Sequence, residues 1–391
     1  MRPRILLLWL LLAACASGVH AQAQAPALLH KDLREEVLRI PARAVDAAGR
    51  EIAGHLPVTL YRPQGPGPFP LLIISHGRDS AKRADMPRPR FESAARFFVR
   101  KGFAVAAPLR LGYGELASLG DPEAMLSCNA PRYAAALAAA AGEIVTVARA
   151  LAQLPDIDPA RLVLVGQSVG GVATIAATSL KPAGLIAAIN FAGGHGGNPN
   201  ERRGEPCRPE ALRELARQYG ESNASAMLPT PTLWVYAEND RFFSPVHGRR
   251  WAEAYRSGGG LAELQLLPPF GEDGHKLFAQ GNDIWQPLVD AFLARHGFEQ
   301  PGTLSAPAAS GFAALDDSAA LPRPAPAVKA AYLKFLDAAT PRAFALNNWG
   351  NWGYAVGDDA LSRALSFCQR STGLPCRFYA VNDQVVWSPT P

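Results

Sequence analysis

A serine between closely spaced glycines is the strongest chemical signal in this sequence, in the run Gly166-Gln-Ser168-Val-Gly-Gly171. The apolar residues 162–165 before it are typical of a buried strand, and residues 172–179 after it have a helical pattern. A serine on a sharp strand-to-helix turn holds its hydroxyl above the sheet, and only small residues fit two positions away. The turn also directs the helix dipole and the backbone N–H of Val169 at charge that develops beside the serine. We therefore predict that Ser168 is a nucleophile and that Val169 supplies one oxyanion donor.

This part of the chain also resembles a known fold. Residues 56–298 resemble the α/β-hydrolase fold and, within it, the dienelactone-hydrolase-like and prolyl-oligopeptidase-like branches, in which x-Gly-Gly follows the nucleophile as it follows Ser168 here. Dienelactone hydrolases proper carry a cysteine at the nucleophile position, so the serine favours ordinary esters as substrates. A glycine-flanked turn without any chemistry is the alternative interpretation.

The resemblance implies an acid and then a histidine downstream of the serine. Asp240 follows the apolar residues 232–237 in a loop that resembles the family's acid loop, with Glu238 as the rival acid. His275 lies in the glycine-containing segment 271–278, after the last predicted core strand. In these roles His275 is the general base and then the general acid, while Asp240 fixes its tautomer without taking a proton. A solvated turn aspartate and an exposed loop histidine are the alternatives.

A second oxyanion donor is expected from the loop Ser75-His-Gly-Arg78, which resembles the family's His-Gly loop. The resemblance assigns this donor to the backbone N–H of Arg78, with that of Gly77 as the near alternative. It gives His76 a structural role.

Further substrate contacts are expected where loops follow strands, because pockets in such sheets open beyond the carboxyl ends of the strands. The segments around Tyr113 and His195 follow predicted strands at this edge. We therefore predict substrate contacts from Gly77, Tyr113 and His195. A packed turn at Tyr113 and a flexible loop at His195 are the alternatives.

The elements that position these residues belong to the α/β class. Short β-branched runs alternate with helical patterns, which predicts a mostly parallel sheet with helices on both faces. Strands are predicted at residues 58–61, 71–75, 103–108, 162–165, 185–191, 232–237 and 264–267, and helices at residues 91–101, 134–154, 246–256 and 285–296. Residues 112–132 and 193–225 fit neither period and are predicted to be loops or a lid.

Other segments are predicted on either side of a catalytic domain spanning residues 30–298. Residues 1–21 have the pattern of a signal peptide. Leu12-Ala-Ala-Cys15 also resembles a lipobox. The alternative is therefore a lipoprotein signal over residues 1–14, with a lipidated Cys15 as membrane anchor. An Ala/Pro-rich linker is predicted over residues 299–326 and a small α+β module over residues 327–391.

Export would place the cysteines in a compartment that permits disulfides. Besides Cys15 the sequence holds Cys128, Cys207, Cys368 and Cys376. The closeness of Cys368 and Cys376 favours a local bond, which leaves Cys128 to pair with Cys207. Four buried free thiols are the alternative.

Composition excludes several classes of function. The net charge of +5 comes from scattered basic residues, so no nucleic-acid partner is expected. The sequence has no phosphate loop and no HExxH motif, and we expect neither a metal nor another cofactor. We predict a periplasmic or secreted serine hydrolase acting on a small-molecule carboxylic ester through an acyl-enzyme. A serine peptidase of the prolyl-oligopeptidase type and a catalytically inactive envelope-binding protein are the alternatives.

Overall fold

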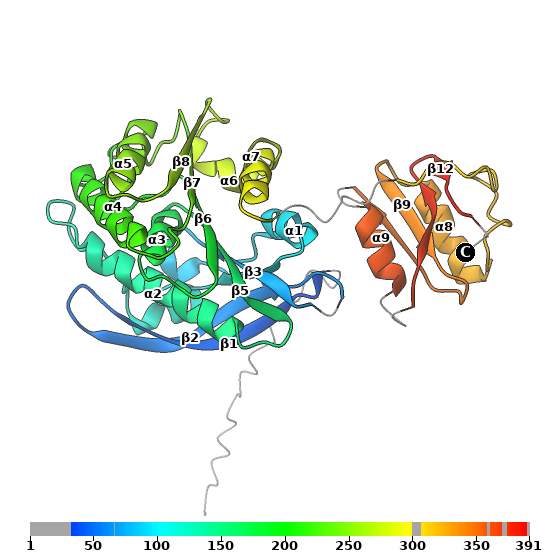
Figure 1. Cartoon of the computed structure of the whole chain (residues 1–391), viewed down its shortest axis with the longest axis horizontal. Helices are drawn as coiled ribbons and strands as arrows, with labels where there is room; N and C mark the ends of the chain where they lie inside the picture. Colours follow the sequence, from blue (N-terminus) through cyan, green and yellow to red (C-terminus); the bar gives the residue numbers. More distant parts are fainter. Residues whose placement is uncertain (1–32, 66, 299–305, 358–359, 370–373, 389–391) are drawn as a thin grey trace, which may run out of the picture.

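The computed structural model describes residues 33–65, 67–298, 306–357, 360–369 and 374–388. Two sheets organise these residues, one of eight strands and one of four. Figure 1 shows the unit around the larger sheet in blue to yellow and the smaller unit in orange to red. The predicted signal segment, including Cys15, lies outside the described residues.

The larger sheet has the strand order β1-β2-β4-β3-β5-β6-β7-β8. Its strands are β1 (Glu36–Val45), β2 (Glu51–Tyr61), β3 (Phe69–Ser75), β4 (Ala104–Pro108), β5 (Ile157–Gln167), β6 (Leu185–Phe191), β7 (Thr232–Ala237) and β8 (Ala262–Leu267). β2 pairs antiparallel with both β1 and β4, and all other neighbours are parallel. The parallel strands therefore end at one edge, where α/β sheets form their sites. The sheet is mostly parallel, as predicted.

Helices cover both faces of this sheet (Figure 1). They are α1 (Glu92–Arg100), α2 (Tyr133–Leu151), α3 (Val169–Thr178), α4 (Pro209–Ala224), α5 (Pro245–Ser257), α6 (Leu277–Gln280) and α7 (Asn282–Arg295). Successive side chains of a strand point to opposite faces. Leu162 and Leu164 of β5 therefore join the core with α2 to α5, while Val163 and Val165 join the core with α1, α6 and α7.

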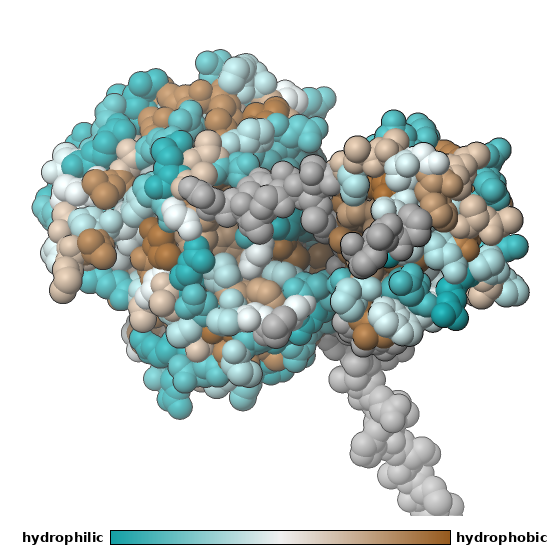
Figure 2. Space-filling model, turned by 45° about the vertical axis from the view of Figure 1, so that its right-hand side comes forward, coloured by the Kyte–Doolittle hydropathy of each residue, from teal (hydrophilic) through white to brown (hydrophobic). Residues whose placement is uncertain are grey.

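The surface and the long apolar helix α2 both fit a globular unit. α2 is long and apolar enough to span a bilayer, but 61% of its most apolar window is buried inside the structure, as in the core helix of a folded domain. Figure 2 shows hydrophilic and hydrophobic residues interspersed over the visible face of the molecule.

α4 corrects the prediction of a loop or lid over residues 193–225. Its helix begins at Pro209, where the missing N–H costs no hydrogen bond. Arg217 pairs with Glu214 on the exposed face, three residues away, while Leu212 on the other face is buried. The helical pattern was hidden because the preceding residues 193–208 are glycine-rich and irregular.

The hairpin β1–β2 is a second difference, since the sequence predicted only residues 58–61 of it. In β1 buried residues alternate with exposed ones, so one face of this edge strand meets solvent. Arg39 and Arg43 on that face, with Pro41 between them, weakened the strand signal.

The smaller unit is an antiparallel sheet between two helices. Its elements are α8 (Pro326–Leu336), β9 (Arg342–Leu346), β10 (Trp352–Val356), α9 (Ala360–Gln369), β11 (Arg377–Val381) and β12 (Gln384–Val385), with strand order β10-β9-β11-β12. Phe344 and Leu346 pack in the core with α8, whereas Ala343 and Ala345 pack in the core with α9. The predicted disulfide Cys368–Cys376 is present.

Part of the predicted linker, residues 299–326, packs on the smaller unit. Leu321 is buried in the α8 core, and the backbone N–H of Ser310 donates to the carbonyl of Val385. The Tyr332 hydroxyl donates to the Leu315 carbonyl at 2.6 Å. Residues 306–326 of the predicted linker therefore form part of the smaller unit, despite their Ala/Pro-rich composition.

Candidate active site

Ser168 occupies a strained turn between β5 and α3. Its φ of 58° and ψ of −126° are unusual for a residue with a side chain, and the residue is only 7% exposed. A Cβ at Gly166 would lie 2.1 Å from the Gly170 carbonyl oxygen, and one at Gly170 would lie 2.2 Å from that of Ser75. The glycines of the motif are therefore required by the tight packing of backbone around this serine.

Asp240 and His275 meet in the two loops that follow β7 and β8. His275 Nδ1 lies 3.0 Å from Asp240 Oδ2. The Asp240 side chain is fully buried and that of His275 is 11% exposed. Asp240 Oδ1 also accepts the backbone N–H groups of Phe242 and Phe243, at 2.8 and 2.9 Å. A carboxylate at Nδ1 stabilises the tautomer protonated there and leaves Nε2 as the proton acceptor.

The rival acid Glu238 has an exposed side chain, whereas Asp240 holds the histidine. The resemblance to the family's acid loop favoured Asp240 and left Glu238 as the alternative, because both carboxylates follow the same strand within three residues.

The histidine loop is joined to the serine turn through Gln167. The Gln167 Nε2 group donates to the His275 carbonyl oxygen at 2.8 Å. The Phe242 and Phe243 rings contact the imidazole, with centroids 4.3 and 5.5 Å away, and line the same cavity as Ser168. Among the described residues the Ser168 hydroxyl and the His275 ring form no direct hydrogen bond. Such bonds are often long in unliganded sites and shorten in the complex.

The proposed oxyanion donors flank Ser168. A Cβ at Gly77 would lie 3.0 Å from the Ser168 Cβ, so the loop after β3 passes directly beside the serine. The backbone N–H groups of Arg78 and Val169 form no hydrogen bond with any residue in the part of the chain that the structure describes. Both residues line the cavity with Ser168. These two N–H groups are thus available to a ligand oxygen.

The cavity at Ser168 has a volume of about 570 Å³. Its walls come from the loop after β3, the turn at Ser168 and the long loop after β6, with Phe242 and Phe243 beside the histidine. Charged residues of both signs line it, including Arg78, Arg202 and Glu201. The cavity therefore offers both aromatic and polar surface to a ligand.

His195 lines this cavity, as the prediction of a substrate contact requires. Its Nε2 lies 3.0 Å from the Glu123 carbonyl oxygen and therefore carries the proton in the neutral ring. Burial lowers the pKa of His195 to about 4. The imidazole is therefore neutral at neutral pH.

Burial of Tyr113 contradicts its predicted substrate contact, whereas the contact of Gly77 stays a prediction. Tyr113 is fully buried, and its hydroxyl donates to Glu123 at 2.6 Å and accepts from Arg78 at 3.1 Å. The ring packs edge-on against His76. Tyr113 thus supports the wall from behind, and Gly77 lies against Ser168 rather than on the cavity surface.

His76 has the structural role expected of it. Its Nε2 accepts the Arg110 backbone N–H at 3.2 Å, and its Nδ1 lies 2.7 Å from the Gly77 carbonyl oxygen. Burial lowers the pKa of His76 to about 3, so the ring remains neutral. It fixes the loop that carries Arg78.

A buried ion pair behind the cavity was missed by the sequence analysis. Arg110 and Glu123 form this pair, and both side chains are fully buried. Arg110 also donates to the Ser75 hydroxyl at 2.8 Å. Burial alone would raise the pKa of Glu123, but the charge and hydrogen bonds of Arg110 outweigh it and lower that pKa to about 2. No sequence signal marks this pair, because charged residues in irregular segments are usually solvated.

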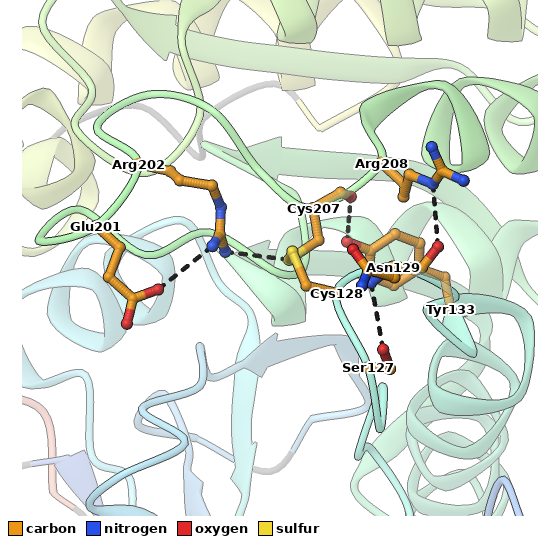
Figure 3. The surroundings of a disulfide bond; sticks show 8 residues. All are labelled: Ser127, Cys128, Asn129, Tyr133, Glu201, Arg202, Cys207 and Arg208. Carbon is orange, nitrogen blue, oxygen red and sulfur yellow. Dashed lines mark hydrogen bonds and ion pairs between the residues drawn. A yellow bond between two sulfur atoms is a disulfide. The ribbon is translucent and has the colours of Figure 1, made fainter.

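The predicted disulfide Cys128–Cys207 joins two loops of the cavity wall (Figure 3). Cys128 itself lines the cavity. The Arg202 guanidinium lies between the Cys207 sulfur, 3.1 Å away, and the Glu201 carboxylate, 3.3 Å away. The Tyr133 hydroxyl donates to the Cys207 carbonyl. The wall is therefore cross-linked both covalently and by hydrogen bonds.

No metal centre is evident in the described part of the chain, where no three His, Cys, Asp or Glu residues are arranged to hold an ion.

The strand order and the serine turn at the end of β5 are those of the α/β-hydrolase fold, which this chain has. No family model and no curated protein matches the chain. Similar solved structures include Thermogutta terrifontis esterase 2 phosphonylated by cyclosarin, at 17% identity and TM-score 0.45, covering 68% of this chain and 96% of that one. Est1E from Butyrivibrio proteoclasticus is 16% identical with TM-score 0.43, covering 66% and 98%. The Pyrococcus horikoshii acylaminoacyl peptidase is 15% identical with TM-score 0.48, covering 68% of this chain but 42% of that one.

Proposed function

We propose that this protein is a serine hydrolase that cleaves carboxylic esters through an acyl-enzyme on Ser168. The observation that carries the proposal is the buried Asp240–His275 pair tied through Gln167 to the strained serine turn. A buried carboxylate, an oriented imidazole and a hydroxyl on a tight turn are the parts that acyl transfer needs.

In the first half-reaction His275 Nε2 takes the Ser168 proton as the hydroxyl oxygen attacks the ester carbonyl carbon. The carbonyl oxygen gains negative charge and accepts hydrogen bonds from the backbone N–H groups of Val169 and Arg78. The intermediate then expels the alcohol, which takes its proton from His275. Asp240 stabilises the imidazolium throughout and stays ionised.

In the second half-reaction water attacks the acyl-enzyme. His275 accepts a proton from this water and returns it to the Ser168 oxygen as the acid leaves. Each turnover therefore consumes one ester and one water and regenerates the free hydroxyl. None of these steps calls on a metal, so chelators are expected to leave turnover unchanged.

We also propose that the enzyme works in the periplasm or outside the cell. The two disulfides suit an oxidising compartment, and residues 1–21 have the composition of an export signal. Removal of residues 1–14 with anchoring through a lipidated Cys15 is the alternative to removal of residues 1–21, and mass spectrometry of the mature protein distinguishes the two.

The decisive test compares the wild type with Ser168→Ala. A fluorophosphonate probe is expected to label the wild type at Ser168 and not the variant. Turnover of a short p-nitrophenyl ester is expected to fall by about 10⁶-fold in the variant. Folded wild-type protein that is not labelled would instead favour a binding protein, and faster cleavage of aminoacyl amides than of esters would favour a peptidase.

A further inference from the structure

Gln167 is the residue before the serine in the glycine motif and takes no part in the proton transfers of the proposed reaction. It is the last residue of β5 and is half-buried. Its Nε2 group donates to the His275 carbonyl oxygen across a distance of 2.8 Å, although the two residues are 108 positions apart. The contact therefore links the segment of the nucleophile directly to the segment of the general base.

His275 is held at three of its atoms. Its backbone N–H donates to Asp273 Oδ1 at 3.0 Å, and its Nδ1 pairs with Asp240. Asp273 Oδ1 also accepts the Arg241 N–H at 3.1 Å, so the first two bonds tie His275 to its own loop and to the acid loop. Of these three hydrogen bonds, only the bond from Gln167 connects His275 to the segment that carries Ser168.

We propose that Gln167 is a positioning residue, which sets the distance from His275 Nε2 to the Ser168 hydroxyl by holding the His275 backbone carbonyl. The inference rests on the proposed function of these two residues. Proton transfer needs heavy atoms about 2.6 to 3.2 Å apart, and a misplacement of about 1 Å costs roughly 100-fold in rate. The imidazole and the acid loop form one hydrogen-bonded body, and loss of the Gln167 side chain removes the direct hydrogen bond between this body and the end of β5.

The residue type fits this role. A glutamine has the length to cross from the end of β5 to the histidine loop, and its amide N–H₂ group is a donor for a carbonyl oxygen. A glutamate of the same size would present a carboxylate oxygen to that carbonyl, where two acceptors repel. A methionine has similar length and shape but no donor.

The test is Gln167→Met, assayed with a short p-nitrophenyl ester. We expect kcat to fall by about 10 to 100-fold, KM to stay within about 2-fold of the wild-type value, and the thermal midpoint to stay near that of the wild type. The rate of fluorophosphonate labelling is expected to fall in parallel with kcat. Gln167→Glu is expected to lose more kcat than Gln167→Met.

A matched control is Gln265→Met on β8, whose side chain donates to Glu263 at 3.1 Å on the same sheet but away from the histidine. It is expected to keep wild-type kcat and KM. A Gln167→Met variant with kcat within 2-fold of wild type would overturn the inference, as would a fall in kcat matched by a rise in KM or a clear fall in thermal midpoint. Should Gln167→Met fail to fold, Gln167→Glu decides in the same way. If Ser168→Ala keeps turnover, the proposed function itself fails, which is a separate outcome.

Discussion

The two sides of the cavity are built in different ways. The histidine side comprises residues 238–244 and 268–276. It is held by hydrogen bonds between loops that follow neighbouring strands, such as those from Asn239 Nδ2 to the carbonyls of Phe270 and Gly271. The disulfide side, residues 109–132 and 192–208, is held by the Cys128–Cys207 bond and the buried pair Arg110–Glu123.

The difference follows from topology. β7 and β8 are parallel neighbours, so their loops leave the same edge side by side and ordinary polar side chains reach across. The disulfide side joins segments 79 residues apart that share no strand pair. Its residues lose more chain entropy when they order, so stronger links are needed to hold them. We therefore expect changes on the histidine side to act mainly on turnover, and changes on the disulfide side to act mainly on stability and substrate affinity.

The largest effect is expected from Asp240→Asn on the histidine side. The amide offers its N–H₂ group to His275 Nδ1 and so stabilises the wrong tautomer, which is expected to lower kcat by about 10⁴-fold with little loss of stability. Ester kinetics and a melting curve measure both quantities. The exposed neighbour Glu238→Gln is the control and is expected to keep wild-type turnover; the reverse result would transfer the acid role to Glu238.

The next effect is expected from Cys128→Ser combined with Cys207→Ser. Loss of a link between residues 79 apart is expected to destabilise the larger unit by about 4 kcal/mol through the entropy of the unfolded chain. We also expect KM to rise more than kcat falls, because the cavity wall loosens. Urea denaturation, monitored by the esterase activity that remains, measures the loss of stability.

The matched control is Cys368→Ser combined with Cys376→Ser, which removes the other disulfide. This bond closes a short loop in the smaller unit. Esterase activity and its loss in urea are expected to stay as in the wild type. An unchanged KM in the Cys128 and Cys207 variant would contradict the assignment of the disulfide to the cavity wall.

Glu123→Gln is expected to cost about 3 kcal/mol, since it leaves Arg110 buried without a carboxylate. The folded-state pKa of Glu123 lies below its unfolded value, so the stabilisation is present above about pH 4.3 and is lost as pH falls toward 2. Urea denaturation of the two proteins at pH 7 and pH 3.5 is therefore expected to differ less at the lower pH. Glu214→Gln, which removes an exposed partner of Arg217 on α4, is expected to leave the midpoint unchanged.

The last change, Glu143→Gln behind the same wall, is expected to raise stability instead of lowering it. Burial, helped by the charge of Glu123, raises the pKa of Glu143 to about 8. The folded state therefore binds a proton that the unfolded state releases, and stability falls as pH rises from about 4.3 to about 8. Glutamine can still accept the Leu111 N–H and has no charge to bury, so we expect the variant to gain more stability over the wild type at pH 8 than at pH 5. An equal gain at pH 5 would show that the ionisation of Glu143 is not its source.

Local patterns predicted most of the larger unit. Residues 185–191 and 232–237 form strands within the predicted bounds, because continuous apolar runs are typical of strands buried on both faces. Local patterns did not predict α4 or β1. The glycine-rich segment before α4 obscured its helical pattern, and β1 carries charged residues on its solvated face.

The candidate site divides in the same way. The glycines around Ser168, the position of a carboxylate after β7 and of a histidine after β8 could be predicted, because each depends on a local turn and on chain order. Between the two carboxylates, the resemblance favoured Asp240 but left Glu238 open, because the choice depends on which carboxylate the fold buries beside the imidazole.

By itself, the sequence determined the elements and the kinds of reactive groups, since helix and strand periods and tight turns depend on neighbouring residues. Tertiary structure alone decided that Tyr113 faces Glu123 instead of the cavity, that Arg110 and Glu123 pair out of water, and that Gln167 reaches the His275 carbonyl. These contacts join residues whose separation along the chain carries no pattern. A polar side chain in a loop has the same local sequence whether the fold exposes it to water or buries it against a partner.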